Sequence, residues 1–372
     1  MKKVYLHIGI HKTGSSSIQQ SLFDAKDKIV EQGFFYFCQD FDGVDRPLPQ
    51  KWIDLKGFNS PTIKDEVKFN QLLKKVQQDK IIISIEALAW FYTQEAVESV
   101  ARALKGFDVD VITYIRRQDK QMVSYHQEGS KGKNKPSTAY YGAAICPFDI
   151  KNSEYLNYYQ RSMVWAEAFG KQNIKVRIFE PEKLVNKDVV ADFCNLVGLS
   201  GVNSVRVNES LGFEATKVGQ LINLSNLNDD NLVKKIRENL SSEGKLLPSK
   251  SAAENFYKQF IVSNQKLNNE FEIAQGGLFK DDFDDYPEQG NNTWDELTAN
   301  KAITSIFNGI KEAQKTKDSE YVNKLRDEAI SLEKEDLTMA YYLMKRAYTL
   351  RPHGPVIKHK LAEYKDKLNI VG

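Results

Sequence analysis

Along residues 1–200, apolar positions switch repeatedly between two spacings. Short runs of consecutive β-branched and other apolar residues predict buried strands. After each run, apolar residues recur three or four positions apart, which is the period of a helix with one buried face. The strands are expected at 3–10, 79–88, 109–115 and 174–179, and the helices at 14–30, 93–105, 118–127 and 189–199. Strands that are apolar throughout and alternate with helices predict an α/β fold, with a parallel sheet covered by helices on both faces.

Both spacings are lost between residues 129 and 152, where glycine, proline, lysine and small polar residues dominate. An irregular stretch of this length is uncommon inside a compact domain. It is either a solvated surface insertion or a loop that covers a bound substrate. The side chains of interest there are three lysines and two tyrosines: Lys131, Lys133, Lys135, Tyr140 and Tyr141. Such a combination would suit an acidic sugar, and it would equally keep a loop in solution.

Helical spacing resumes from residue 211 to about residue 274, and an acidic, turn-rich segment follows at 278–294. That segment has no period and predicts a linker. We therefore expect a main α/β domain over residues 1–290 and a helical appendage over 291–372.

The appendage is helical throughout. The positions of Ala340, Met344, Ala347 and Pro352 resemble the second half of a tetratricopeptide repeat. One such unit is not stable alone. We expect these helices to pack on the main domain or on a protein partner and to contribute no catalytic group.

Composition narrows the function classes. The chain has 372 residues, of which 41% are hydrophobic and 27% charged, as in a globular protein. A net charge of +2 gives no reason to expect a nucleic-acid partner. No apolar run approaches the ~18 residues of a membrane span. The three cysteines are scattered, and no export signal precedes them, so we expect reduced thiols in the cytoplasm. The five histidines show no metal-ligand spacing, so no metal is expected.

The most informative segment is HIGIHKTGSSSIQ, residues 7–19. It lies between the first strand and the first helix, where backbone N–H groups and the helix dipole favour an anion. Gly9 and Gly14 keep the spacing of a nucleotide P-loop, but Ser15 stands where that loop has its lysine. Lys12 lies two residues before Gly14 instead. The segment predicts a P-loop-like site for a phosphate-type anion without the usual magnesium chemistry, or else an ordinary strand-to-helix turn.

A second basic position follows the third predicted strand. Arg116 ends the run VITYI, and Ser124 lies eight residues later, two turns into the next helix. Ligands of open α/β sheets bind outside the carboxyl ends of the strands, where Arg116 is expected. Two such junctions together predict a ligand with two phosphate-like ends.

At these residues the sequence resembles the sulfotransferases that use 3′-phosphoadenosine-5′-phosphosulfate (PAPS). HKTGSSS is similar to their 5′-phosphosulfate loop, and the arginine and serine of YIRRQDKQMVSYHQ are similar to their 3′-phosphate motif. The chain resembles bacterial sulfotransferase-like proteins more closely, through HIG-x-HKTG, Ser-x-Glu, FEPEKL, NESL and DDYPE. The resemblance covers about residues 1–290.

The resemblance implies PAPS as the sulfuryl donor, without a metal. Lys12 would contact the oxygen between phosphate and sulfate, and Arg116 with Ser124 would hold the 3′-phosphate. The residues around Lys12 would wrap the 5′-phosphate, with His11 orienting the loop: Thr13, Gly14, Ser15 and Ser16. The resemblance also implies a hydroxylated acceptor, and a bacterial carbohydrate is the family-weighted expectation.

A general base is needed to take the acceptor's proton. Glu86, at the end of the second predicted strand, is the first candidate, and its alternative role is helix capping or a salt bridge. His126 is the second, although on a helix it faces away from Ser124. A basic loop at 244–251 is a further candidate for the adenine side.

Two other functions remain open. A P-loop nucleotide kinase would need a lysine after Gly14 and a magnesium ligand, and the sequence has neither. A catalytically silent relative that serves as a binding module is the other alternative, against which both anion motifs argue.

Overall fold

The computed structural model describes residues 1–55, 60–132, 147–149, 153–206, 211–225, 227, 229–291 and 293–370. The chain forms two compact units. The first comprises Met1–Asn223 and Glu243–Thr293, and the second comprises Leu224–Ser242 and Trp294–Gly372. Within the described ranges, no helix combines the length and the apolarity that crossing a membrane requires.

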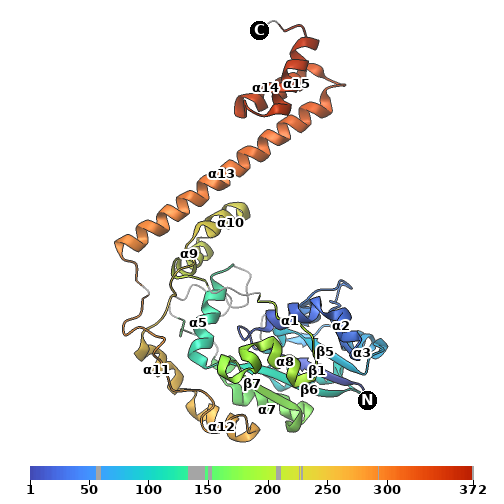
Figure 1. Ribbon diagram of the computed structural model, residues 1–372, viewed down its shortest axis with the longest axis vertical. Helices are drawn as coiled ribbons and strands as arrows, with labels where there is room; N and C mark the ends of the chain where they lie inside the picture. Colours follow the sequence, from blue (N-terminus) through green and yellow to red (C-terminus); the bar gives the residue numbers. More distant parts are fainter. Residues whose placement is uncertain are drawn as a thin grey trace. The chain divides into compact units, whose positions relative to one another are not determined.

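The first unit contains a five-stranded parallel sheet with the strand order β2-β5-β1-β6-β7 (Figure 1). Its strands are β1 (Lys3–His7), β2 (Phe34–Tyr36), β5 (Lys80–Ser84), β6 (Asp108–Ile115) and β7 (Ile174–Ile178). A short antiparallel pair is made by β3 (Ile53–Asp54) and β4 (Thr62–Ile63). The predicted α/β fold with a parallel sheet is confirmed. The sequence analysis missed β2, which has only three residues.

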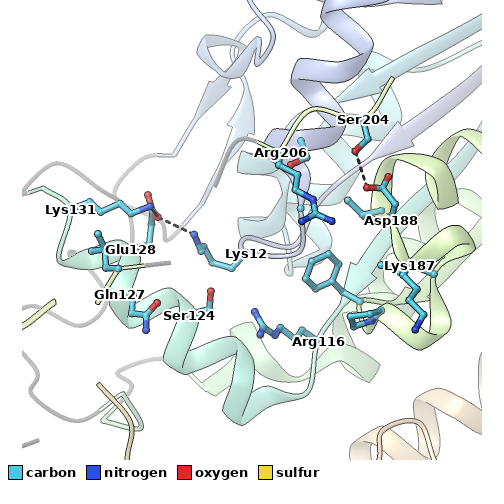
Figure 2. Close-up of a pocket in the computed structure, with 17 residues that line it drawn as sticks. Lys12, Arg116, Ser124, Gln127, Glu128, Lys131, Lys187, Asp188, Ser204 and Arg206 are labelled. Carbon is cyan, nitrogen blue, oxygen red and sulfur yellow. Dashed lines mark hydrogen bonds and ion pairs between the residues drawn. The ribbon is translucent and has the colours of Figure 1, made fainter. Parts of the chain in front are cut away.

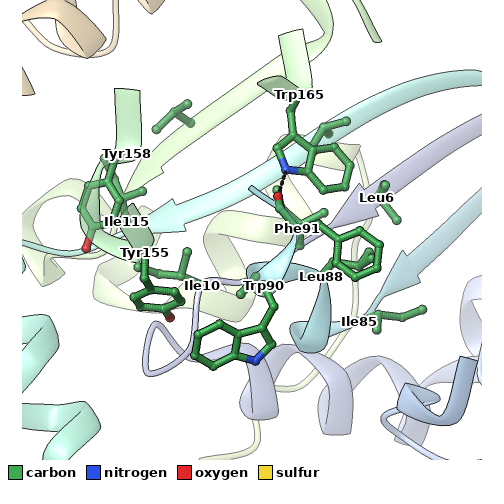
Figure 3. Close-up of a cluster of buried hydrophobic side chains, with 14 of the residues drawn as sticks. Leu6, Ile10, Ile85, Leu88, Trp90, Phe91, Ile115, Tyr155, Tyr158 and Trp165 are labelled. Carbon is green, nitrogen blue, oxygen red and sulfur yellow. Dashed lines mark hydrogen bonds between the residues drawn. The ribbon is translucent and has the colours of Figure 1, made fainter. Parts of the chain in front are cut away.

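Both faces of the sheet are buried, as the apolar strands predict. Alternate residues of one strand enter different clusters: Ile81 and Ile83 lie in one, and Ile82 lies in the other. The larger cluster packs β1 and β5 against α4 (Gln94–Ala103) and α7 (Tyr158–Phe169). Trp165 of α7 donates its indole N–H to the carbonyl of Phe91 at 3.0 Å (Figure 3). The smaller cluster packs the other face against α1 (Ser15–Asp24) and α8 (Val189–Val197).

The helices of the first unit lie between the strands and after the sheet. They are α1 (Ser15–Asp24), α2 (Lys26–Val30), α3 (Glu66–Lys75), α4 (Gln94–Ala103), α5 (Gln118–Gly129), α7 (Tyr158–Phe169), α8 (Val189–Val197), α9 (Phe213–Leu224), α11 (Lys250–Lys258) and α12 (Ile261–Phe271). Short 3-10 turns are η1 (Gln50–Trp52), η3 (Glu86–Trp90), η4 (Ser153–Leu156), η5 (Lys171–Asn173), η6 (Pro181–Lys183) and η7 (Val185–Lys187).

The helix expected at 14–30 is two helices, because the backbone leaves the helical region at Ala25 (φ −97°, ψ 7°). Ile18, Leu22 and Ile29 are all buried in the same cluster, so the apolar spacing does not register the break.

The acidic segment at 278–294 was expected to be a linker, but its first half packs into the first unit. Phe279, Phe283 and Tyr286 are buried in the larger cluster. Arg117 anchors the backbone there, because its Nη1 donates to the carbonyls of Lys280 and Asp282. The acidic composition of this segment predicted a linker, although its aromatic residues attach it to the core of the first unit.

The second unit is helical. It consists of α10 (Asp230–Asn239), α13 (Glu296–Leu332), α14 (Leu337–Leu350) and α15 (Pro355–Lys367). A Cβ on Gly309 would lie 2.5 Å from the Cα of Ile236, so α10 and α13 approach closely there. Its buried core includes Val322, Ala340 and Ile357, and also Met344 and Ala347 of the repeat-like positions. The helical C-terminal region is therefore confirmed, and the resemblance to a tetratricopeptide repeat stays a prediction.

Candidate active site

The loop between β1 and α1 is held in shape by its own hydroxyl groups. Thr13 and Ser15 both donate to the carbonyl of Ile10, at 2.6 and 3.2 Å, and both side chains are buried. Gly14 caps α1 with φ +83°, and a Cβ on it would lie 2.6 Å from Cγ1 of Val189. The loop therefore needs glycine at this position, both for its backbone conformation and for its approach to the start of α8.

This loop forms one wall of a cavity of about 340 Å³. The other walls are the end of β6, one face of α5, the segment from Phe179 to the start of α8, and residues 204–206. Of the residues that the sequence analysis assigned to the cofactor, Lys12, Gly14, Arg116 and Ser124 line this cavity (Figure 2). The two junctions that were expected to act together do open on the same space.

Arg116 is half-buried beside this cavity. Its guanidinium lies over the ring of Phe179, 5.9 Å from the centroid. Burial lowers the pKa of Arg116, because desolvation disfavours the charged form. Of the residues that the structure describes, none forms an ion pair with this guanidinium. Ser124 reaches the same cavity from α5, so a cation and a hydroxyl are available there for one anionic group.

Lys12 lies on the loop between β1 and α1, lines the cavity and has a left-handed backbone (φ +64°). Its Nζ is 3.1 Å from Oε2 of Glu128, and Nζ of Lys131 is 3.0 Å from the same oxygen. Burial alone would raise the pKa of Glu128, but the two ammonium groups outweigh burial and lower that pKa to about 2. Glu128 is therefore a carboxylate at neutral pH.

Three polar residues at the far end of the cavity were not predicted. Asp188 caps α8, since its Oδ1 accepts from the N–H groups of Val190 and Ala191, each at 2.9 Å. Its Oδ2 accepts from the hydroxyl of Ser204 at 2.8 Å, which fixes the segment that carries Arg206. Arg206 is exposed and lines the cavity (Figure 2). The basic loop that we expected at 244–251 does not line it; Lys250 pairs instead with Asp284, at 2.7 Å.

The serines of the loop differ from one another in position. Ser17 lines the cavity, whereas Ser15 is turned towards Ile10 and Ser16 is half-buried at the start of α1. Ser17 belongs to the HKTGSSS segment, but the residues assigned to the 5′-phosphate ended at Ser16. The sequence signal for Ser17 was the run of three serines, because successive residues at the start of a helix point in different directions around its axis.

The two histidines that were assigned to the site, His11 and His126, are buried and do not line the cavity. His11 packs between Trp90, Tyr125 and Tyr155, its Nδ1 lies 2.9 Å from the hydroxyl of Tyr155, and burial lowers its pKa to about 3. Its carbonyl accepts from Gln121 at 2.7 Å, which ties the loop to α5. His11 is therefore a buried neighbour of Lys12, and its role in orienting the loop stays a prediction.

His126 is buried on α5, and its Nε2 lies 2.8 Å from Nε2 of Gln220. Glu86 begins η3 directly after β5 and is half-buried. Its Cγ lies 3.7 Å from the position of a Cβ on Gly9, so Glu86 lies beneath the start of the loop. Its charge adds to the effect of burial in raising the pKa of Tyr155. Neither residue is among those that line the cavity.

Some predicted residues lie outside the described part of the chain. They are Lys133, Lys135, Tyr140 and Tyr141 of the irregular loop, and Asn208 to Ser210 of the NESL segment.

No protein-family model matches the sequence. A segment of 172 residues is 27% identical to an uncharacterized protein of Archaeoglobus fulgidus and covers 43% of this chain and 45% of that protein. The chain thus spans less than half the length of this relative. Among solved structures, a sulfotransferase from Alicyclobacillus acidocaldarius is similar with a TM-score of 0.39 and 13% identity, over 73% of this chain and 96% of that chain. Neither similarity identifies an activity for this protein.

Proposed function

We propose that this protein is a sulfotransferase that moves the sulfuryl group of PAPS to a hydroxyl group of a carbohydrate acceptor. The observation that carries the proposal is the meeting of two motifs at one cavity. Lys12 and Gly14 come from one strand-to-helix junction, Arg116 and Ser124 come from another, and all four line the same space. A ligand with anionic groups at two ends fits this arrangement better than a ligand with one.

The residues present suit such a donor. The buried guanidinium of Arg116 has no ion-pair partner among the described residues, so a bound 3′-phosphate would supply the missing counter-charge. The 5′-phosphate would meet the N-terminus of α1, near Gly14 and Ser17, where the N–H groups and the helix dipole favour an anion. PAPS, when bound, supplies an activated sulfuryl group on its 5′-phosphate. Lys12 would place a positive charge where negative charge develops during transfer.

The side chains of the loop fit a nucleotide kinase less well than a sulfotransferase. A nucleotide P-loop needs lysine at the position of Ser15, and the hydroxyl of Ser15 is turned inwards to Ile10 at 3.2 Å. That position therefore stabilises the loop and offers no cation to a terminal phosphate.

For the general base we favour Glu86 over His126. Glu86 lies beneath the loop that carries Lys12, whereas the ring nitrogen of His126 is engaged with Gln220 inside the protein. Glu86→Gln is expected to keep donor affinity and to lose turnover, because the amide preserves shape and cannot accept a proton. Single-turnover assays with labelled PAPS measure this. Near-normal turnover in Glu86→Gln together with an inactive His126→Ala would reverse the assignment.

On this proposal residues 1–290 hold the donor and the acceptor. The helices of residues 291–372 contribute no catalytic group and are available to a protein partner.

The donor assignment is tested by titrating the protein with 3′,5′-adenosine bisphosphate, the product of the donor. We expect binding to raise the melting temperature equally with and without a chelator, since protein groups supply the positive charge. The matched ligand is 5′-AMP, which lacks the 3′-phosphate and should bind at least about tenfold more weakly, the scale of one charge-assisted contact. Stabilisation by ATP with magnesium, and none by the bisphosphate, would favour the kinase instead.

A further inference from the structure

One carboxylate oxygen in the cavity is shared by two lysines. Oε2 of Glu128 lies 3.1 Å from Nζ of Lys12 and 3.0 Å from Nζ of Lys131. The three side chains are mostly buried, with 21%, 17% and 28% of their surfaces exposed for Glu128, Lys12 and Lys131. Figure 2 shows Lys12 directed towards Glu128 and away from Arg116. The lysine that the proposed function assigns to the donor is thus engaged with a carboxylate.

We infer that Glu128 is a positioning residue, which holds the Lys12 ammonium at the cavity wall and yields it to an incoming anion. The inference rests on the proposed function for the identity of that anion. It needs from the structure only that an anion enters the cavity beside Lys12.

The ion pair with Glu128 restricts the conformations of the Lys12 side chain. Lysine has a flexible four-carbon stem and loses considerable rotamer freedom when it is fixed. Lys12 lies on a loop residue with a left-handed backbone, and Glu128 fixes its free end within the cavity wall before the ligand arrives. The Lys12 side chain is then ordered in the free protein, but an anion must compete with Glu128 for its ammonium group.

The second lysine explains how Glu128 can release the first. Taking a cation away from a half-buried carboxylate is costly unless another positive charge stays beside it. Lys131 follows the end of α5 and stays on the same oxygen, so Glu128 keeps a counter-charge when Lys12 turns to the ligand. Because Lys131 stays beside Glu128, the free-energy cost of moving Lys12 from Glu128 to the ligand is low.

A role as general base is less consistent with this environment. The two ammonium groups hold the pKa of Glu128 at about 2, far below the pH of the reaction. A carboxylate this acidic is a weak proton acceptor. Its charge acts on Lys12, and through Lys12 on the ligand.

The test measures the affinity of 3′,5′-adenosine bisphosphate by calorimetry. Glu128→Gln removes the competing charge and should tighten binding about three- to tenfold, the scale of a partly buried ion pair. Lys131→Gln removes one of the two lysines from this oxygen, so Glu128 holds Lys12 more strongly and binding should weaken about two- to threefold. Damage to the cavity would weaken binding in both variants, so a gain in Glu128→Gln distinguishes positioning from structure.

Two controls sharpen the result. Glu66→Gln changes the net charge equally, but Glu66 pairs with Arg102, so its effect on affinity should be within about twofold. In a Lys12→Ala background, the gain from Glu128→Gln should shrink to within about twofold, because the residue it acts through is gone. An equal gain in Glu66→Gln, or an undiminished gain without Lys12, would overturn the inference.

Inorganic pyrophosphate separates the two proposals. If pyrophosphate binds more tightly to Glu128→Gln and the bisphosphate binds to neither protein, the inference holds and the donor assignment fails. If the wild-type protein binds the bisphosphate and Glu128→Gln binds it no more tightly, the inference fails and the donor assignment stands. Binding of neither ligand to either protein would overturn both.

Discussion

Two adjacent arginines at the end of β6 have opposite environments. Arg117 is almost fully buried, and its Nε and Nη2 donate to the two oxygens of Asp119 at 2.7 and 2.8 Å. Its remaining group, Nη1, donates to two carbonyls of the segment that carries Tyr286. Arg116, one residue earlier, lies against Phe179 beside the cavity and has no ion-pair partner among the described residues.

The contrast separates a structural cation from one that is available to a ligand. Successive residues of an extended chain point to opposite sides, so the strand end directs one arginine into the protein and the other to the cavity. Burial of a cation is tolerated when a carboxylate and carbonyls surround it, as they do Arg117. At Arg116, burial outweighs the charges of Asp119 and Glu180 and lowers the pKa, and no described residue forms an ion pair with its guanidinium. The two arginines therefore differ in whether acceptors surround the guanidinium, and not in burial alone.

The larger effect is expected at Arg117. Arg117→Ala leaves the Asp119 carboxylate buried with the hydroxyl of Tyr286, at 2.7 Å, as a remaining partner. Breaking a buried pair in this way typically costs about 3–5 kcal/mol of unfolding free energy. Urea unfolding measures the loss, and the double variant Arg117→Met/Asp119→Leu should recover part of it because no charge is left uncompensated. A loss of unfolding free energy below about 1 kcal/mol would show that the contacts of Arg117 do not stabilise the fold.

The sequence predicted the sheet well because its strands are buried on both faces. Three of the predicted strands, β1, β5 and β6, are largely apolar, whereas β7 alternates apolar residues with Lys175 and Arg177; all four alternate with helices along the chain. The fifth, β2, is three residues of a short aromatic run, too brief for a period to appear. The break at Ala25 was invisible for a related reason, since apolar residues on both sides of it face the same cluster.

The site was partly predictable, because Arg116 and Ser124 are close in sequence and belong to one strand-to-helix junction. The carbonyls that accept from Arg117 lie more than 160 positions away, in an acidic segment whose aromatic residues gave no period. Arg206 and Ser17 were missed for different reasons. Arg206 reaches the cavity only because Asp188 and Ser204 fix its segment, and no local pattern encodes that contact.

The smaller effect is expected at Arg116, and on the ligand instead of the fold. Arg116→Ala removes an uncompensated, half-buried charge, so the unfolding free energy should stay within about 0.5 kcal/mol of the wild-type value or rise slightly. Affinity for 3′,5′-adenosine bisphosphate should fall by about 1.5–3 kcal/mol, the scale of a charge-assisted contact. Affinity for 5′-AMP should change much less, because that ligand lacks the 3′-phosphate that we assign to Arg116 and Ser124. Calorimetry with both ligands measures the difference, and Ser124→Ala should show the same selectivity with a smaller loss. Equal losses for the two ligands would place Arg116 at the 5′ end of the donor, and a loss of stability comparable to that of Arg117→Ala would remove the contrast between the two arginines.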